Sequence, residues 1–143
     1  MHPILRNTLA VLAGVVVGSI VNIGLIQLGP ALIPPPAGGD VSSMEGLAAT
    51  MHLFEPKHFV FPFLAHALGT FAGAWTAARL AAGKRLMLGL LIGVFFLAGG
   101  IASVLSLPSP VWFTVLDLGL AYIPMGYLAG RLAEKLSLQM SDE

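Results

Sequence analysis

The sequence predicts an all-α integral membrane protein, a transmembrane bundle of four helices with a short amphipathic helix in an outer loop. Hydrophobic residues make up 57% of the 143 positions and charged residues only 10%, whereas soluble domains average about 25% charged residues. The apolar residues gather into four stretches, each close to the roughly 20 residues that a helix needs to cross a bilayer. We place these spans near residues 7–29, 58–80, 86–106 and 111–131 of a single membrane domain covering residues 1–143.

Positive charges gather on one side of the predicted spans, which sets their orientation. With the N-terminus in the cytoplasm, Lys57 alone falls on the outer side. The inner side receives Arg6, Arg79, Lys84, Arg85, Arg131 and Lys135. This asymmetry follows the positive-inside rule. It predicts a multi-pass protein of the bacterial cytoplasmic (inner) membrane, with both the N-terminus and the C-terminus in the cytoplasm.

The outer loop, residues 30–57, separates the first two spans. Ser42 and Ser43 are typical helix-start residues. Three apolar residues share one face of the segment that follows them: Leu47, Met51 and Phe54. We therefore expect a short amphipathic helix that lies on the outer leaflet.

Two prolines lie inside predicted spans, Pro62 in the second and Pro124 in the fourth. Proline removes a backbone hydrogen bond and tends to kink a helix. We expect a kink at each position.

Every span carries a G-x-x-x-G pair, which forms a groove where another helix backbone can approach closely. The pairs are Gly14/Gly18, Gly69/Gly73, Gly89/Gly93 and Gly126/Gly130. The grooves serve either packing within the bundle or the docking of a second subunit, for which Gly126/Gly130 is the candidate. In the predicted topology the pairs lie in the cytoplasmic half or at the middle of the membrane. We expect a bundle that is tight inside and looser outside, with a cavity opening outward.

The same glycines suggest an internal repeat. Gly14, Gly18 and Gly24 of the first span map onto Gly89, Gly93 and Gly99 of the third at a constant offset, and Gly69 and Gly73 map onto Gly126 and Gly130. Either the chain is a duplicated helical hairpin, or glycine-rich helices match by chance.

Ionisable residues inside spans usually face a protein interior or a wet cavity, because a charge in hydrocarbon is costly. His66 and Asp117 are the clear examples, each roughly 10 Å below the outer end of its helix. Asn22 reaches a similar depth, so we expect the three to meet, with Gln27 lining the approach. Together with Tyr122 they are the candidate ligand-binding or proton-titrating residues. The alternatives are a structural clamp between helices, or an Asp117 that turns to the outer surface.

A second candidate site is the H-x-x-E-x-x-H string of His52, Glu55 and His58. Imidazole and carboxylate groups are suitable zinc ligands. Pro56 interrupts any single helix that would carry all three side chains. The alternative is a polar and aromatic membrane interface.

Residues 121–126 read AYIPMG, which resembles the A-Y-I-P-x-G stretch of the small multidrug resistance transporters, a family of four-span proteins. That family carries an essential membrane-embedded glutamate in its first span, where this chain has no acidic residue, so the resemblance does not imply the family's activity. Residues 34–38, 65–69 and 116–130 look like small uncharacterised four-span bacterial inner-membrane proteins, and that resemblance implies the class alone.

Composition excludes several functions. Seven Lys/Arg balance seven Asp/Glu, so the chain has no excess of basic residues that would attract nucleic acid. The absence of cysteine excludes disulfides, thiolate metal sites and iron–sulfur clusters. No G-x-G-x-x-G, Walker, G-x-S-x-G or H-E-x-x-H motif occurs, and no cofactor is predicted.

Three functions fit these observations. The first is a non-enzymatic protein that binds or transports a small molecule or ion in an outward-facing polar pocket. The second is a structural or accessory subunit of a larger membrane complex. The third is a small quinone-binding membrane enzyme that uses His66 and Asp117 as acid and base. The expected partners are membrane lipids and a homo-oligomer or larger membrane complex.

Overall fold

The computed structural model describes residues 2–140, which form helices joined by short connections and contain no strand. The α-helices are α1 (Pro3–Leu32), α2 (Met44–Thr50), α3 (Val60–Leu80), α4 (Arg85–Ser106), α5 (Val111–Leu120) and α6 (Ile123–Gln139). Two short 3-10 helices, η1 (Met51–Leu53) and η2 (Pro56–Phe59), connect α2 to α3. The predicted all-α class is confirmed.

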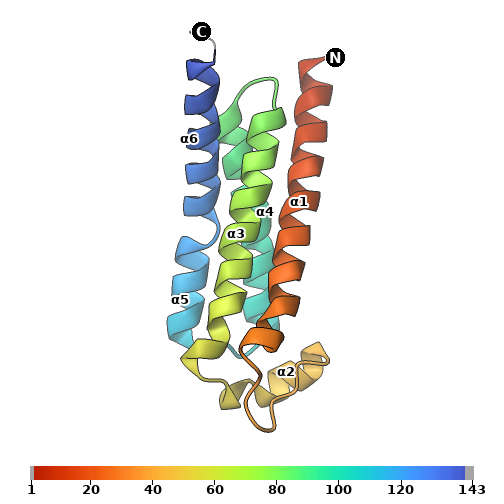
Figure 1. Cartoon of the computed structure of the whole chain (residues 1–143), viewed down its shortest axis with the longest axis vertical. Helices are drawn as coiled ribbons and strands as arrows, with labels where there is room; N and C mark the ends of the chain where they lie inside the picture. Colours follow the sequence, from red (N-terminus) through yellow and green to blue (C-terminus); the bar gives the residue numbers. More distant parts are fainter. Residues whose placement is uncertain (1, 141–143) are drawn as a thin grey trace.

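Within the described part of the chain, four segments are long and apolar enough to cross a membrane. They are Pro3–Leu32, Pro56–Leu80, Arg85–Ser106 and Val111–Gln139. Each contains or closely matches one predicted span, so the protein is a multi-pass membrane protein built as a four-span bundle. The start of α1 and the end of α6 lie at one end of the bundle, and α2 lies at the other (Figure 1).

Glycines join α1 to α3. A Cβ added at Gly14 would come within 2.5 Å of the Gly73 carbonyl oxygen, and one at Gly18 within 2.7 Å of the Gly69 carbonyl oxygen. Contact this close between backbones leaves no room for a side chain, and it supplies much of the attraction between helices in lipid.

The second helix pair, α4 and α6, repeats this arrangement. A Cβ at Gly89 would meet the Gly126 carbonyl oxygen at 2.7 Å, and one at Gly126 would meet the Cα of Gly93 at 3.2 Å. The grooves therefore pack within the bundle, and Gly126/Gly130 is not a free docking face as the subunit interpretation required. The closest contacts do not follow the repeat: Gly14 meets the Gly73 carbonyl oxygen, whereas its counterpart Gly89 comes nearest the carbonyl oxygen of Gly126, which the repeat matches to Gly69. The duplicated hairpin stays a prediction.

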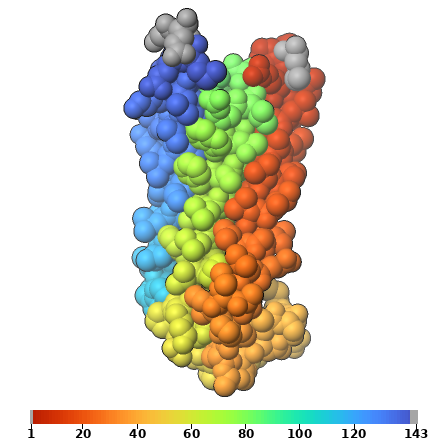
Figure 2. All heavy atoms as spheres, viewed as in Figure 1, coloured from red at the N-terminus to blue at the C-terminus, as the bar shows by residue number. Residues whose placement is uncertain are grey.

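The two pairs meet through α3, which packs on α1, α4 and α6. In contrast, α1 contacts α4 only weakly and forms one side of the molecule (Figure 2). Large apolar side chains on its outer face, including Leu9, Leu12, Val16 and Ile20, are about half exposed or more. In a membrane these side chains face lipid.

Proline breaks the fourth span but not the second. The break falls at Ala121 and Tyr122, between α5 and α6. Pro124 follows in the first turn of α6, where it has no N–H for the Leu120 carbonyl. The kink predicted at Pro62 is wrong, because Pro62 lies in the first turn of α3, where a helix leaves its N–H groups unpaired.

The helix predicted in the loop between the first two spans is confirmed as α2, and the Ser43 side chain caps it by accepting from the Gly46 N–H at 3.0 Å. Its apolar face packs against other residues of the same chain. Met51 is buried in a cluster with Phe59 and Phe113, and Leu47 and Phe54 pack against that cluster. The loop therefore closes over the ends of α3 and α5.

Candidate functional site

The candidate site joins α3, α5 and the break before α6. His66 lies on α3, Asp117 in the last turn of α5, and Tyr122 in the break. Residues five apart in a continuous helix point about 140° away from each other. The break before Pro124 turns Tyr122 so that its side chain reaches back to Asp117.

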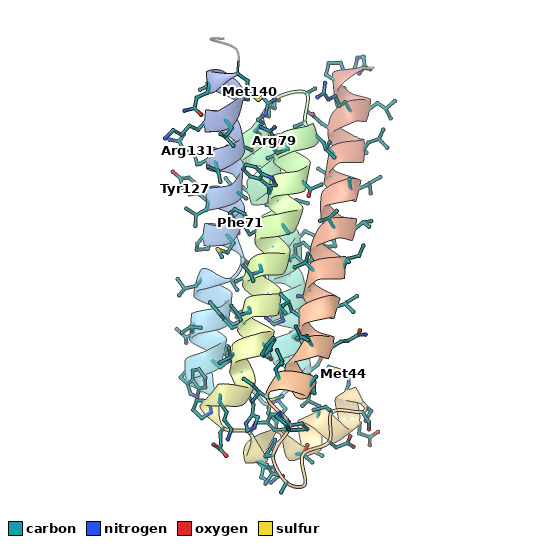
Figure 3. All side chains as sticks on the ribbon, viewed as in Figure 1. Met44, Phe71, Arg79, Tyr127, Arg131 and Met140 are labelled. Atoms are coloured by element: carbon teal, nitrogen blue, oxygen red, sulfur yellow. The ribbon has the colours of Figure 1, made fainter. Side chains whose placement is uncertain are left out.

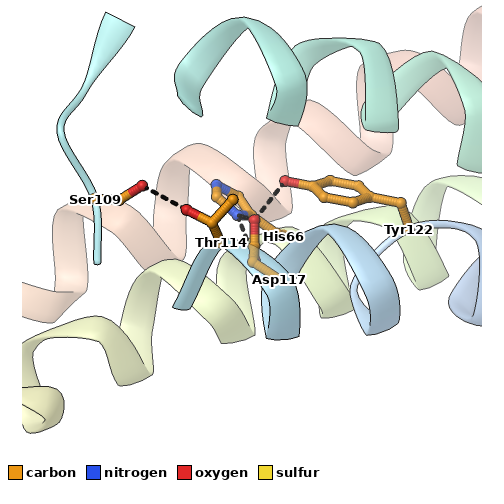
Figure 4. Close-up of polar contacts among 5 residues, drawn as sticks. All are labelled: His66, Ser109, Thr114, Asp117 and Tyr122. Carbon is orange, nitrogen blue, oxygen red and sulfur yellow. Dashed lines mark hydrogen bonds and ion pairs between the residues drawn. The ribbon is translucent and has the colours of Figure 1, made fainter. Parts of the chain in front are cut away.

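Hydrogen bonds cover both oxygens of the Asp117 carboxylate. Nδ1 of His66 lies 2.9 Å from Oδ1 and 2.9 Å from Oδ2, and the Tyr122 hydroxyl donates to Oδ2 at 3.0 Å (Figure 4). The His66 and Tyr122 rings also stack, with centroids 5.7 Å apart. Asp117 is only 2% exposed. The expectation that Asp117 turns to the outer surface is therefore wrong.

These contacts fix the tautomer of the His66 ring when Asp117 is ionised. An ionised carboxylate can only accept hydrogen bonds, so Nδ1 of His66 carries the hydrogen that it shares with Asp117. In the neutral ring Nε2 then holds a lone pair and acts as an acceptor. Figure 4 shows this second nitrogen directed away from Asp117. The hydrogen bonds of the His66 ring both involve Nδ1, and Nε2 is not one of the buried unpaired atoms of the described residues, so Nε2 is accessible.

A cavity of about 250 Å³ lies beside His66. Its walls come from α1, α3, α4 and the break, and they include Ser19, Asn22, His66, Phe96, Ser103 and Tyr122. Asp117 is not part of the wall. The arrangement is thus a polar cavity with one imidazole edge at its surface and a carboxylate behind that imidazole.

The predicted site residues separate into three groups. His66, Asp117 and Tyr122 bond to one another, and Asn22 faces the same cavity. Gln27 is not part of it: five residues beyond Asn22, it points to another side of α1. It lines a separate, mostly apolar cavity of about 290 Å³ beneath the outer loop. The expectation that Gln27 lines the approach to His66 is wrong for this reason.

The His52, Glu55 and His58 string does not converge. Nδ1 of His58 accepts from the Glu55 N–H at 2.9 Å and helps to cap η2. Glu55 pairs with Lys57 at 3.3 Å. Among residues 2–140, no three His, Cys, Asp or Glu side chains are placed to hold a metal ion.

Some residues of the site have weak or no sequence signals. Ser19 and Ser103 are polar residues inside apolar spans, so their depth could have marked them. Phe96 looks like any lipid-facing aromatic residue. The Ser109 and Thr114 hydroxyls lie 3.0 Å apart (Figure 4), which ties the turn before α5 to the helix that carries Asp117.

No protein-family model matches the chain, and neither a curated protein nor a solved structure matches it. Function is therefore inferred from the chain's own residues.

Proposed function

We propose that the protein is a non-enzymatic membrane protein that binds or transports a small molecule or ion in the cavity beside His66. The supporting observation is a pair formed by the half-buried His66 and the buried Asp117, whose free ring nitrogen is accessible from that cavity. Ionisable residues within a membrane-spanning bundle are costly and commonly mark ligand or proton pathways. A clamp between α3 and α5 would need the pair but not the polar cavity next to it.

The pair gives the cavity two chemical states. With a neutral ring, Nε2 of His66 accepts a hydrogen bond from a ligand. After the ring takes up a proton, Nε2 becomes a donor, and the Asp117 carboxylate balances the new charge. The site can therefore bind a ligand through either kind of hydrogen bond and can couple binding to a proton.

The accessory-subunit alternative has lost its main support. Its predicted docking surfaces were the glycine grooves, and these pack against one another within the chain. A partner helix or second copy would have to use another face, such as the exposed side of α1.

We also propose an inner-membrane location with both termini in the cytoplasm. Arg79 and Arg131 lie toward the end of the bundle where α1 begins (Figure 3). At the same end, Nε of Arg6 donates to the Leu80 carbonyl at 2.8 Å, and the Asn7 side chain accepts from the Ala82 N–H at 2.8 Å. In this orientation the cavity lies in the outer half of the membrane.

Two measurements on matched variants test the binding function. His66→Phe keeps a ring but removes both nitrogens. Thr76→Val is the control, because the Thr76 hydroxyl bonds only the Ala72 carbonyl of its own helix. Native mass spectra of protein extracted in mild detergent would reveal a co-purifying ligand. Thermal unfolding with a panel of polar and apolar compounds would reveal an added one, since ligands that bind the folded state stabilise it.

The expected result is a ligand that stays with the wild type and with Thr76→Val and is lost from His66→Phe. Asp117→Asn should weaken the same binding, because it no longer provides a charge behind the ring. If neither measurement finds a ligand that depends on His66, the proposed function is wrong.

A further inference from the structure

The exposed part of the wall of the cavity beside His66 lies on α1 and α4, so the cavity opens sideways between these helices and not outward as expected from the sequence. Two residues of its wall are exposed and form the rim, Ile23 on α1 at 55% and Gly99 on α4. A Cβ added at Gly99 would meet nothing within 4 Å. Helix α1 packs chiefly on α3, and α4 packs on α6 and α3, whereas α1 and α4 contact each other only weakly. In a membrane the gap faces lipid chains, so a ligand can enter from the hydrocarbon layer.

The charge of the cavity wall restricts the ligand that can enter. Among the described residues that line the cavity, none is Lys, Arg, Asp or Glu. The nearby Asp117 carboxylate already accepts from His66 and Tyr122. An ion would lose its water without a free counter-charge in contact, which is costly inside a membrane. The wall therefore favours a neutral head group.

The hydrogen-bonding group of the ligand follows from the His66 tautomer. Since Nδ1 donates to Asp117, Nε2 of the neutral ring is an acceptor and calls for an O–H or N–H donor on the ligand. Ser19, Asn22 and Ser103 line the same space and can donate or accept. A hydroxyl group on the ligand satisfies this arrangement.

Size and shape favour one ring. An apolar cavity of about 150 Å³ accommodates benzene, so about 250 Å³ accommodates a single substituted ring. Phe96 and Tyr122 provide aromatic surface in the wall. A longer apolar tail would not fit inside but can extend through the gap beside Gly99.

We propose that the ligand is a membrane-dissolved phenol or quinol, bound with its ring in the cavity, its hydroxyl on Nε2 of His66 and its tail leaving between Ile23 and Gly99. This inference rests on the proposed binding function and adds the class of ligand and its route of entry.

The test uses 4-dodecylphenol and its methyl ether, in which a methyl group replaces the hydroxyl hydrogen and removes the donor. Binding of each to the full chain in nanodiscs is measured by equilibrium titration. Gly99→Leu places a side chain in the gap between α1 and α4 through which the ligand would enter. Gly24→Leu is the matched control, because a Cβ at Gly24 also meets nothing within 4 Å and Gly24 does not line the cavity.

We expect the wild type and Gly24→Leu to bind the phenol equally, and Gly99→Leu to lose that binding. The methyl ether should bind the wild type about tenfold more weakly, the effect of one hydrogen bond. Equal binding of phenol and ether, unchanged binding by Gly99→Leu, or no binding of the phenol to the wild type would each overturn this ligand class. If the phenol does not bind but the binding of another ligand depends on His66, the proposed binding function holds and the phenol or quinol class is wrong. If no ligand depends on His66, both are wrong.

Discussion

Nδ1 of His66 lies 2.9 Å from both carboxylate oxygens of Asp117, although 51 residues separate the two along the chain. This contact links α3, which packs on three other helices, to α5, the shorter half of a broken span. Tyr122 bonds the same carboxylate from the break itself. The geometry of the cavity wall therefore depends on the Asp117 carboxylate, even though that carboxylate does not line the cavity.

The first prediction concerns the Tyr122–Asp117 hydrogen bond. Tyr122→Phe removes the hydroxyl but keeps the ring that stacks on His66. Its unfolding free energy should fall by about 0.6 kcal/mol, the average measured for hydrogen bonds between membrane helices, and by no more than about 1.7 kcal/mol, the largest measured value. Reversible unfolding in mixed detergent micelles would measure this loss.

A double-mutant cycle provides the control for that prediction. In an Asp117→Ala background the Tyr122 hydroxyl has already lost its acceptor, so adding Tyr122→Phe should cost almost nothing further. A full, additive loss in the double variant would show that the hydroxyl acts through another partner.

The second prediction compares two glycines of α1. Gly14→Ala would bring a Cβ within 2.5 Å of the Gly73 carbonyl oxygen, so the helices must separate, at a cost of about 1 to 3 kcal/mol. Gly24→Ala meets nothing within 4 Å and should leave the unfolding free energy unchanged or raise it by up to about 1 kcal/mol. Unfolding of the two variants under the same conditions measures the difference, and equal stabilities would contradict the packing of α1 on α3.

The third prediction is a pH dependence in the outer loop. The Ser42 hydroxyl donates to Asp40 at 2.6 Å and the Ser42 backbone N–H at 2.8 Å. These bonds, the hydroxyl first, hold the pKa of Asp40 below its ordinary value. A lowered pKa means that the carboxylate stabilises this turn at pH values above about 3.9, the ordinary aspartate pKa. That stabilisation is lost as the pH falls through the lowered pKa.

Amide hydrogen exchange at Ser42 can follow this change. Protection of the amide, corrected for the intrinsic pH dependence of exchange, should be constant near neutral pH and fall in the acid range. Asp40→Asn should show no such acid step, because its side chain does not titrate. An acid step of equal size in Asp40→Asn would assign the pH dependence to another group.

The fold was predictable because lipid imposes strong constraints on sequence. A spanning helix must be long and apolar, and each of the four is visible in the sequence as a long, mainly apolar stretch. The glycine pairs likewise predict close packing, but they do not say which helix each one meets. Only the structure pairs Gly14 with Gly73 and Gly89 with Gly126, and so excludes the Gly126/Gly130 groove as a free docking face.

The site was only partly predictable. Depth along each span brought Asn22, His66 and Asp117 to one level, because residue number converts directly to height in a helix. The direction of a side chain around the helix is harder to infer, and for this reason Gln27 was assigned to the wrong cavity. The Tyr122–Asp117 bond depends on a helix break whose geometry Pro124 signals but does not specify.

The last prediction tests the proposed orientation in the membrane. The chain has no native cysteine, so labelling of a single introduced cysteine shows on which side of the membrane that residue lies. His52→Cys lies in the exposed outer connection and Ala82→Cys in the exposed turn between α3 and α4. On intact bacterial cells a membrane-impermeant maleimide should label His52→Cys and should label Ala82→Cys only after permeabilisation. The positive charges near the Ala82 turn are the physical reason, because positive residues are retained on the cytoplasmic side. The reverse pattern would invert the bundle and move the cavity to the inner half of the membrane, and labelling of both variants on intact cells would indicate two orientations.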